Sequence, residues 1–155
     1  DMEFGARALG NTSTLALPTK ENVKYINMLN GRSTIMPMAG MIREDKINQY
    51  YNGEDKVHKS LEYMIMTLNY KFTPDDEYMG CHHKYPITEL YSNRIQKITK
   101  NHYLYDVFDY FDMIINTSFN IHGQPIVYSV DQIIDAISFQ AEKDIDNRVI
   151  NIVII

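Results

Sequence analysis

The spacing of apolar residues predicts five short strands along this chain. Residues 62–70 are rich in β-branched and aromatic side chains, residues 94–98 alternate polar with apolar, and residues 112–116 form a short apolar run. The composition of residues 62–70 is typical of strands. The alternation at residues 94–98 fits a half-buried strand, and the apolar run at residues 112–116 fits a buried strand. Two further strands are predicted at residues 13–16 and 149–155.

Helices are predicted between these strands. The first is expected to begin after Thr19, a suitable N-cap, and to run to Asn30, with Gly31 as its stop. Its buried face consists of three apolar residues about one turn apart, Val23, Ile26 and Leu29. Residues 43–51 and 101–111 are also expected to be helical. A further helix is expected at residues 130–140, with Ser129 as its cap and with Ile133, Ile134 and Ile137 at helical spacing.

The remaining segments are connections. Residues 54–60 are charged and residues 78–93 are punctuated by Gly80 and Pro86, so the first is expected to be exposed and the second irregular. Strands interleaved with helices predict an α/β layer fold around a mixed sheet, in one domain.

Bulk properties narrow the function classes. The chain has 155 residues, a net charge of −5 and one cysteine. An acidic chain is a poor general nucleic-acid binder, because phosphate neutralisation needs clustered Lys and Arg, so nucleic acid is not an expected partner. One cysteine permits no internal disulfide. No apolar run reaches the roughly 20 residues that span a bilayer, so no membrane is expected and a cytoplasmic location is predicted.

The first candidate motif surrounds Arg7. Residues 3–11 read EFGARALGN, in which small residues lie on both sides of one arginine. Small residues let backbone N–H groups approach a ligand, and a guanidinium offers a fork for phosphate or carboxylate oxygens. On chemistry alone, a Gly-rich turn whose arginine caps a helix or pairs with an acid is the favoured interpretation.

The second candidate motif follows the predicted strand at residues 112–116. Residues 116–120 read NTSFN and residues 123–127 read GQPIV. Amides and hydroxyls at the C-terminal end of a strand suit a carbamoyl group or nucleotide phosphates, since open α/β sheets bind ligands there. An Asx-type turn that satisfies its own backbone is an equally good interpretation.

Other chemistry-bearing residues are weaker candidates. Cys81, His82 and His83 are adjacent, but a structural zinc site needs four ligands with recognisable spacing. We therefore expect the two histidines to lie in a partly exposed loop, and no metal ligand is nominated. Cys81 is expected to be inert. Arg32 and Arg94 are each isolated from other cations and could be surface residues.

Taken together, these motifs resemble the C-terminal domain of the O-carbamoyltransferase family, which includes nodulation-factor, cephalosporin and aminoglycoside carbamoyltransferases. Residues 3–10 are similar to its E-F-G-x-R-A-L-G signature, and residues 116–127 to its N-T-S-F-N-x-x-G-x-P-I-V signature. Arg94, Ile95 and Gln96 are similar to its R-x-Q strand, and Pro37 with Ala39 to its R-P-F-A-P segment. The order and approximate spacing match across nearly the whole chain.

The resemblance implies a YrdC-like twisted mixed sheet with flanking helices. It implies a domain, residues 1–155, of a larger enzyme whose N-terminal actin-like domain carries a metal ion. The C-terminal domain would convert ATP and carbamoyl phosphate to carbamoyl-adenylate, for transfer to the hydroxyl of a small-molecule acceptor. On the matching positions, three arginines would act on phosphate or carbamoyl oxygens: Arg7, Arg32 and Arg94. The nucleotide and carbamoyl pocket would be lined by Asn116, Ser118 and Asn120.

Three departures from the family pattern keep a second hypothesis open. Thr12, Asn30 and Met36 stand where the family usually has basic residues. Fewer cations weaken anion binding, because charge-assisted hydrogen bonds are the strong ones. The alternative to an enzyme is therefore a non-catalytic binding or scaffolding domain of the same fold. Neither hypothesis identifies the acceptor or decides between a monomer and an oligomer.

Overall fold

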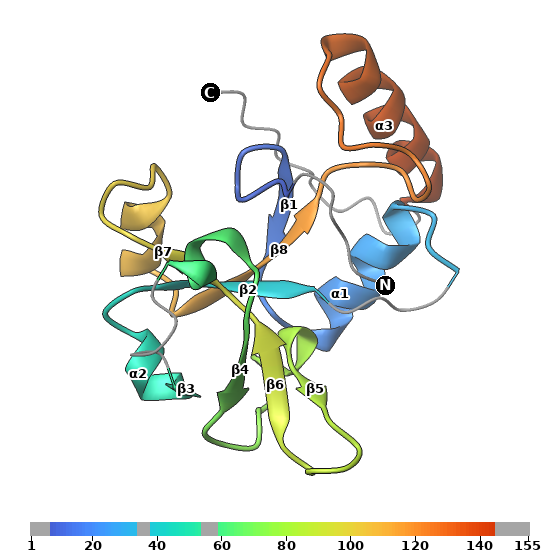
Figure 1. Cartoon of the computed structure of the whole chain (residues 1–155). Helices are drawn as coiled ribbons and strands as arrows, with labels where there is room; N and C mark the ends of the chain where they lie inside the picture. Colours follow the sequence, from blue (N-terminus) through green and yellow to red (C-terminus); the bar gives the residue numbers. More distant parts are fainter. Residues whose placement is uncertain (1–6, 34–37, 54–58, 145–155) are drawn as a thin grey trace.

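Two four-stranded sheets that share one continuous segment form the centre of the molecule (Figure 1). The computed structural model describes residues 7–33, 38–53 and 59–144. The first sheet has the strand order β1-β8-β2-β7, in which β2 and β7 are parallel and the other neighbours are antiparallel. Its strands are β1 (Ser13–Ala16), β8 (Met113–Ser118), β2 (Ala39–Arg43) and β7 (Gln96–Ile98). The predicted mixed α/β architecture is confirmed.

The second sheet is antiparallel and has the order β3-β4-β6-β5. Its strands are β3 (Tyr51–Asn52), β4 (Thr67–Tyr70), β6 (Tyr91–Arg94) and β5 (His83–Lys84). Only Ile95 separates β6 from β7, so one stretch of chain passes from the second sheet into the first. The R-x-Q segment therefore lies where the two sheets join.

Helix α1 (Lys20–Leu29) forms where its sequence predicts it. The Thr19 side chain accepts a hydrogen bond from the Asn22 N–H (3.2 Å), which satisfies one of the free donors in the first turn. The buried residues of the helix include the three apolar ones expected from the spacing. Two of them, Val23 and Ile26, belong with Ile42 and Ile115 to the larger of two apolar clusters, so α1 covers the face of the sheet to which Ile115 points.

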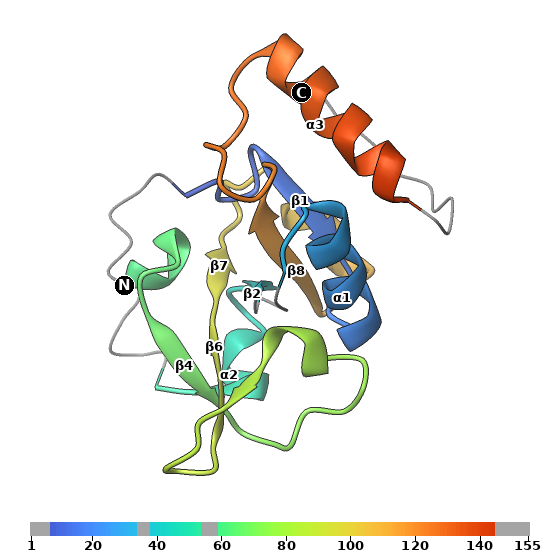
Figure 2. The same cartoon turned by 90° about the vertical axis from the view of Figure 1, so that its right-hand side faces the viewer.

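Helix α3 (Val130–Lys143) also begins as predicted, with the Ser129 hydroxyl accepting from the Gln132 N–H. Its apolar spacing is a poor guide to its packing. Ile134 is 55% exposed, whereas the buried residues of the helix are Ala136 and Gln140. Figure 2 shows α3 beyond the end of the first sheet, next to α1.

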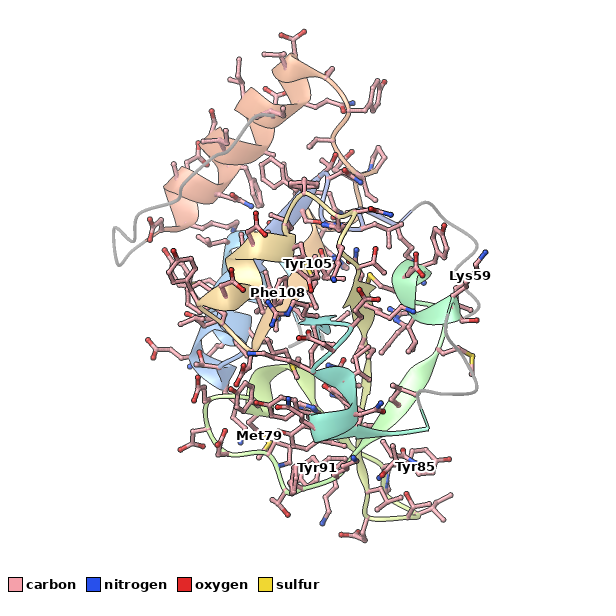
Figure 3. The ribbon with its side chains drawn as sticks, turned by 90° about the vertical axis from the view of Figure 1, so that its left-hand side faces the viewer. Lys59, Met79, Tyr85, Tyr91, Tyr105 and Phe108 are labelled. Atoms are coloured by element: carbon pink, nitrogen blue, oxygen red, sulfur yellow. The ribbon has the colours of Figure 1, made fainter. Side chains whose placement is uncertain are left out.

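The smaller apolar cluster lies on the opposite face of the first sheet. Phe108, labelled in Figure 3, is fully buried there against Met41, Ile98 and Ile114. It belongs to a 3-10 helix, η4 (Tyr105–Asp109), inside the segment 101–111 that was expected to be helical. Because both faces of the first sheet are covered, all three residues of β7 are buried. Residues 94–98 are in strands as predicted except for Ile95, but the half-buried character expected from their alternation is wrong.

Three other sequence-based assignments are corrected. Residues 43–51 are not one helix: strand β2 ends at Arg43, α2 (Ile47–Tyr50) is one turn, and β3 follows. Residues 62–70 form a strand only in their second half, after the 3-10 helix η2 (Ser60–Tyr63). Residues 78–93 are not irregular, since they contain η3 (Met79–Cys81), β5 and most of β6. The strand predicted at residues 149–155 and most of the connection at 54–60 lie outside the described residues.

In the described ranges, no helix combines the length and the apolar character needed to cross a membrane.

Candidate functional site

Arg32 is held directly after the C-terminus of α1 by the way that the helix ends. Its backbone N–H donates to the Asn27 carbonyl (2.9 Å), and the N–H of Gly31 donates to the Met28 carbonyl (3.0 Å). These two bonds form a Schellman motif, which requires a left-handed residue at its centre. Gly31 supplies it with a φ of 71°, and a Cβ there would come within 2.9 Å of the Phe139 ring. The helix stop thus fixes the position of Arg32.

The partners of the Arg32 guanidinium among the described residues are all neutral. Nη1 donates to the Asn27 side-chain oxygen (3.4 Å) and Nη2 to the Thr117 hydroxyl (3.3 Å), both long bonds. Nε is buried and has no partner. Among the ion pairs of the described residues, no carboxylate reaches Arg32. Partial burial lowers the pKa of Arg32 below its ordinary value, so an anion that neutralises this charge would be stabilised.

The end of strand β8 presents its polar side chains to both faces of the sheet. Thr117 lies on the α1 face with Arg32, while Asn116, next to it in the strand, points the other way. Asn116 is 2% exposed, and its Nδ2 donates to the side-chain oxygen of Gln96 at 2.6 Å. Gln96 in turn donates to the carbonyl of Leu9 at 2.9 Å. The second candidate motif is therefore connected to the loop that contains Arg7.

The loop after β8 uses much of its own polar capacity. Ser118 Oγ donates to the side-chain oxygen of Asn120 (2.6 Å), whose Nδ2 donates to the carbonyls of Ile121 and Gln124, both at 3.0 Å. The turn that satisfies its own backbone, weighed above as an alternative for this motif, therefore describes Asn120 well. Ser118 is half-buried and retains acceptor capacity.

Unsatisfied buried polar atoms concentrate in this region. In the described part of the chain, three buried side-chain nitrogen or oxygen atoms lack a hydrogen-bond partner: Asn30 Nδ2, Arg32 Nε and Asn116 Oδ1. Buried polar atoms without partners are rare in native proteins, and each one calls for an explanation. All three belong to the end of α1 or to β8. A bound water or a ligand would supply the missing partners.

Comparison with known proteins identifies the family of the chain. The sequence profile described as "Carbamoyltransferase C-terminus" matches residues 1–155. The chain is 34% identical over 151 residues to the uncharacterised protein MJ1051 of Methanocaldococcus jannaschii, and 30% identical over 159 residues to the nodulation protein NolO of Bradyrhizobium diazoefficiens. The chain belongs to the carbamoyltransferase C-terminus family.

These alignments cover 94% and 96% of this carbamoyltransferase domain, but 28% and 27% of the two relatives. The chain thus spans about a quarter of the length of the curated relatives that it matches.

The signature residues of the carbamoyltransferase domain are distributed as follows. Arg7 is half-buried at the start of the described chain, while Met36 and Pro37 lie outside the described residues. Arg94 is exposed at the end of β6. The preceding residue, Asn93, accepts a hydrogen bond from the Gly40 N–H. Gly40 is next to Ala39, which pairs with Asn116 across the sheet. The structure brings Arg32 into contact with the second signature through Thr117.

The Cys81–His82 pair of the carbamoyltransferase domain is part of a different polar cluster. His82 donates from Nδ1 to the Tyr78 carbonyl (2.7 Å) and accepts at Nε2 from the Tyr51 hydroxyl (2.8 Å). Burial lowers the pKa of His82 to about 4 and raises the pKa of Cys81 to about 12, so both are neutral and the thiol is unreactive at neutral pH. Within the described ranges, no group of three or more His, Cys, Asp or Glu residues could hold a metal ion.

Two surface hollows lie away from the signature residues. One of about 410 Å³ is formed between α1 and η3 and is lined by His82 and His83, and one of about 180 Å³ lies beside Lys46 and Asp112.

Sequence reasoning missed several residues of the site. Thr117 and Gln96 lie inside the quoted signatures, so their positions there could have nominated them as site residues. Asn27 could be predicted only as a residue of the first helix. His102, which contacts the Leu9 carbonyl, is 93 residues away from it and has no local signal.

Proposed function

We propose that this carbamoyltransferase domain activates the carbamoyl donor. It binds ATP and carbamoyl phosphate and forms carbamoyl-adenylate, and the carbamoyl group then passes to an acceptor hydroxyl held by another domain of the same polypeptide. The metal ion implied by the family resemblance is proposed for that other domain. The observation that carries this proposal is Arg32, a half-buried guanidinium whose partners among the described residues are all neutral and whose Nε has none there.

The chemistry of this step demands charge stabilisation more than a general base. Water cleaves carbamoyl phosphate to carbamate and phosphate, a carbamate oxygen attacks the α-phosphorus of ATP, and pyrophosphate leaves. Carbamoyl phosphate, carbamate, ATP and both leaving groups are anions. A fixed cation aligned with their oxygens therefore lowers the barrier by positioning and electrostatics. In the proposal, Arg32 provides such a cation at the end of β8, and Arg7 provides a second from the loop bonded to Gln96.

The remaining signature residues receive roles by the same reasoning. Asn116 offers a buried acceptor, Oδ1, to a ligand N–H, such as that of a carbamoyl group. Ser118 offers its hydroxyl oxygen as an acceptor. Asn120 orients Ser118 through their 2.6 Å bond, and Arg94 contributes positive charge from the sheet junction.

A second candidate is a binding or scaffolding domain without catalysis. It is favoured by Asn30, which is fully buried and accepts from Gln140 at 2.9 Å where the family usually has a cation. That bond connects the end of α1 to α3. The position thus has a structural role in this chain, whereas in the family it usually carries a charge. Such a domain would retain the fold and bind neither ligand.

Isothermal titration of the 155-residue chain with ATP and with carbamoyl phosphate separates the two candidates. Binding of either ligand that weakens at least about tenfold in Arg7→Ala and in Arg32→Gln supports donor activation, since loss of a charge-assisted contact costs about 1.5–3 kcal/mol. Lys100→Ala, at an exposed position outside the signatures, is the matched control and should bind like the wild type. No binding by the wild-type chain at millimolar ligand would favour the non-catalytic domain.

A further inference from the structure

Three side chains from outside the first signature hold two of its successive carbonyls. Gln96 Nε2 donates to the Leu9 carbonyl (2.9 Å), and His102 Nε2 lies 3.2 Å from the same oxygen. The Tyr103 hydroxyl donates to the carbonyl of Gly10. The loop that carries Arg7 is therefore bonded to β7 and to the turn before η4, both distant in sequence.

The backbone at these carbonyls is unusual. Leu9 has a φ of 51° and Gly10 a φ of 91°, so two adjacent residues are left-handed. A non-glycine residue adopts this conformation only where its surroundings enforce it, and such residues concentrate at functional sites. A Cβ on Gly10 would lie 3.2 Å from His102 Cε1 and 3.3 Å from both Leu104 and Met41, so the loop is also packed closely against its supports.

The hydrogen-bonding role of His102 is defined by its second nitrogen. Nδ1 accepts from the backbone N–H of Leu104 at 3.2 Å, so a neutral ring carries its proton on Nε2 and donates it to Leu9. The ring also stacks on Tyr103, with centroids 4.9 Å apart and an interplanar angle of 19°. The two residues thus act as one rigid support.

The orientation of Gln96 is fixed from the other side. Gln96 is 1% exposed, and its Oε1 accepts from Asn116 Nδ2 at 2.6 Å, which leaves Nε2 to face Leu9. Gln96 is thus a buried connection between the first signature and the second. A shift of the Leu9 carbonyl would break a bond to Gln96 that also orients Asn116.

We propose that Gln96, His102 and Tyr103 are positioning residues for ligand binding: they fix the backbone of the first signature and thereby set Arg7 relative to Asn116. This inference rests on the proposed function for its ligand. None of the three is a catalytic residue in the proposal, because each acts through the backbone of residues 9 and 10.

The experiment measures loop protection and ligand affinity separately, on the 155-residue chain. Amide hydrogen exchange at Gly10 and Asn11 reports the loop, because their N–H groups bond Ser13 Oγ and the Ala8 carbonyl. His102→Leu should accelerate both exchange rates by at least about tenfold and weaken carbamoyl phosphate binding by about tenfold. His102→Gln keeps an N–H donor and should recover most of both losses.

Two further variants test whether the effect passes through Arg7. Tyr103→Phe should reproduce the His102→Leu effects at a smaller size, whereas Tyr110→Phe, at an 84% exposed tyrosine, should have none. In an Arg7→Ala background, His102→Leu should weaken binding no further, since the residue to be positioned is gone. A purely structural role would instead give losses that add.

The outcomes separate the two proposals. Unchanged exchange at Gly10 and Asn11 in His102→Leu would overturn the support role, whatever the ligand result. Faster exchange with unchanged affinity, or additive losses with Arg7→Ala, would overturn the positioning role and leave donor activation standing. A wild-type chain that binds neither ligand would overturn donor activation and, with it, the positioning role.

Discussion

Two buried polar clusters in this carbamoyltransferase domain differ in how completely they are satisfied. In the first, Tyr51 donates to His82 and accepts from Asn93 at 3.2 Å, and Asn93 accepts from the Gly40 N–H. None of its buried side-chain nitrogen or oxygen atoms lacks a partner in the described part of the chain. In the second, which spans both faces of the first sheet at the end of α1 and β8, Arg32 and Asn116 each bury an atom without a partner among the described residues.

The difference indicates that the two clusters serve different purposes. A fully satisfied network in a low-dielectric interior rigidifies the core and specifies one packing. A partly satisfied network costs stability, and a folded protein retains that cost where the missing partner arrives with a ligand. We therefore expect changes in the first cluster to alter stability without altering binding, and changes in the second to do the reverse.

The largest effect is expected from Gly80→Ala, which disturbs the support of the first cluster. A Cβ at Gly80 would lie 2.5 Å from the carbonyl oxygens of Pro18 and Thr19, both backbone atoms that cannot yield cheaply. Overpacking of this kind should lower the free energy of unfolding by about 3 kcal/mol, as measured by urea denaturation. Gly53→Asn is the matched control, because nothing lies within 4 Å of a Cβ there and asparagine tolerates a positive φ. Equal stability of the two variants would contradict the packing argument.

An effect of similar size is the loss of stability on acidification to pH 4. His82 has a pKa of about 4 in the folded chain and an ordinary value of 6.5, so between these values the unfolded chain binds more protons. The stabilisation is complete above pH 6.5 and falls as the pH is lowered, by about 3 kcal/mol at pH 4.

A matched pair of variants isolates the share of His82 in this loss. His82→Gln should flatten the pH dependence of the unfolding free energy between pH 6.5 and 4. His83→Gln should flatten the pH dependence less. Partial burial also lowers the pKa of His83, but its side chain is more exposed than that of His82. A larger change from His83→Gln than from His82→Gln would sink the assignment.

A smaller effect, on binding instead of stability, is expected from Arg32→Gln. Affinity for carbamoyl phosphate should fall about 10- to 100-fold, while the free energy of unfolding changes by less than about 1 kcal/mol. Arg43→Gln is the control, because Arg43 already pairs with Asp45 at 2.6 Å and with Asp109 at 2.7 Å. A loss of affinity in Arg43→Gln equal to that in Arg32→Gln would show a general effect of charge.

The smallest effect is expected from Ser118→Ala. It removes one hydroxyl and frees Asn120, which should weaken ligand binding about fivefold, equivalent to about 1 kcal/mol. Ser138→Ala, at an exposed position on α3, should leave the titration unchanged. Unaltered affinity in Ser118→Ala would remove this hydroxyl from the site.

The ends of α1 and the start of α3 could be predicted from the sequence, whereas strand β2 could not. Thr19, Gly31 and Ser129 mark helix ends through hydrogen bonds and dihedral angles within a few residues, so their roles follow from the sequence alone. Strand β2 was missed because residues 39–43 read AGMIR, which has no strand periodicity. Its strand state depends on pairing with β8 and β7, on opposite sides, and four of its five residues are buried.

The same distinction applies to the site. The family resemblance nominated Arg32 and Asn116, but their unsatisfied atoms follow from packing between α1, β8 and β7, which no local pattern specifies. Ile134 is a residue whose secondary structure was predicted correctly but whose burial was not. It lies in helix α3 as its spacing indicates, yet it faces solvent, and the helix buries Gln140 against Asn30 instead.

The most direct test is an NMR titration that observes the Arg32 Nε–H resonance, assigned by its absence in Arg32→Gln. Addition of carbamoyl phosphate should shift this resonance and slow its hydrogen exchange, while the ring signals of His82 stay in place. Saturable binding that leaves Arg32 unchanged, or that shifts His82 instead, would contradict the claim that the unsatisfied cluster is the ligand site.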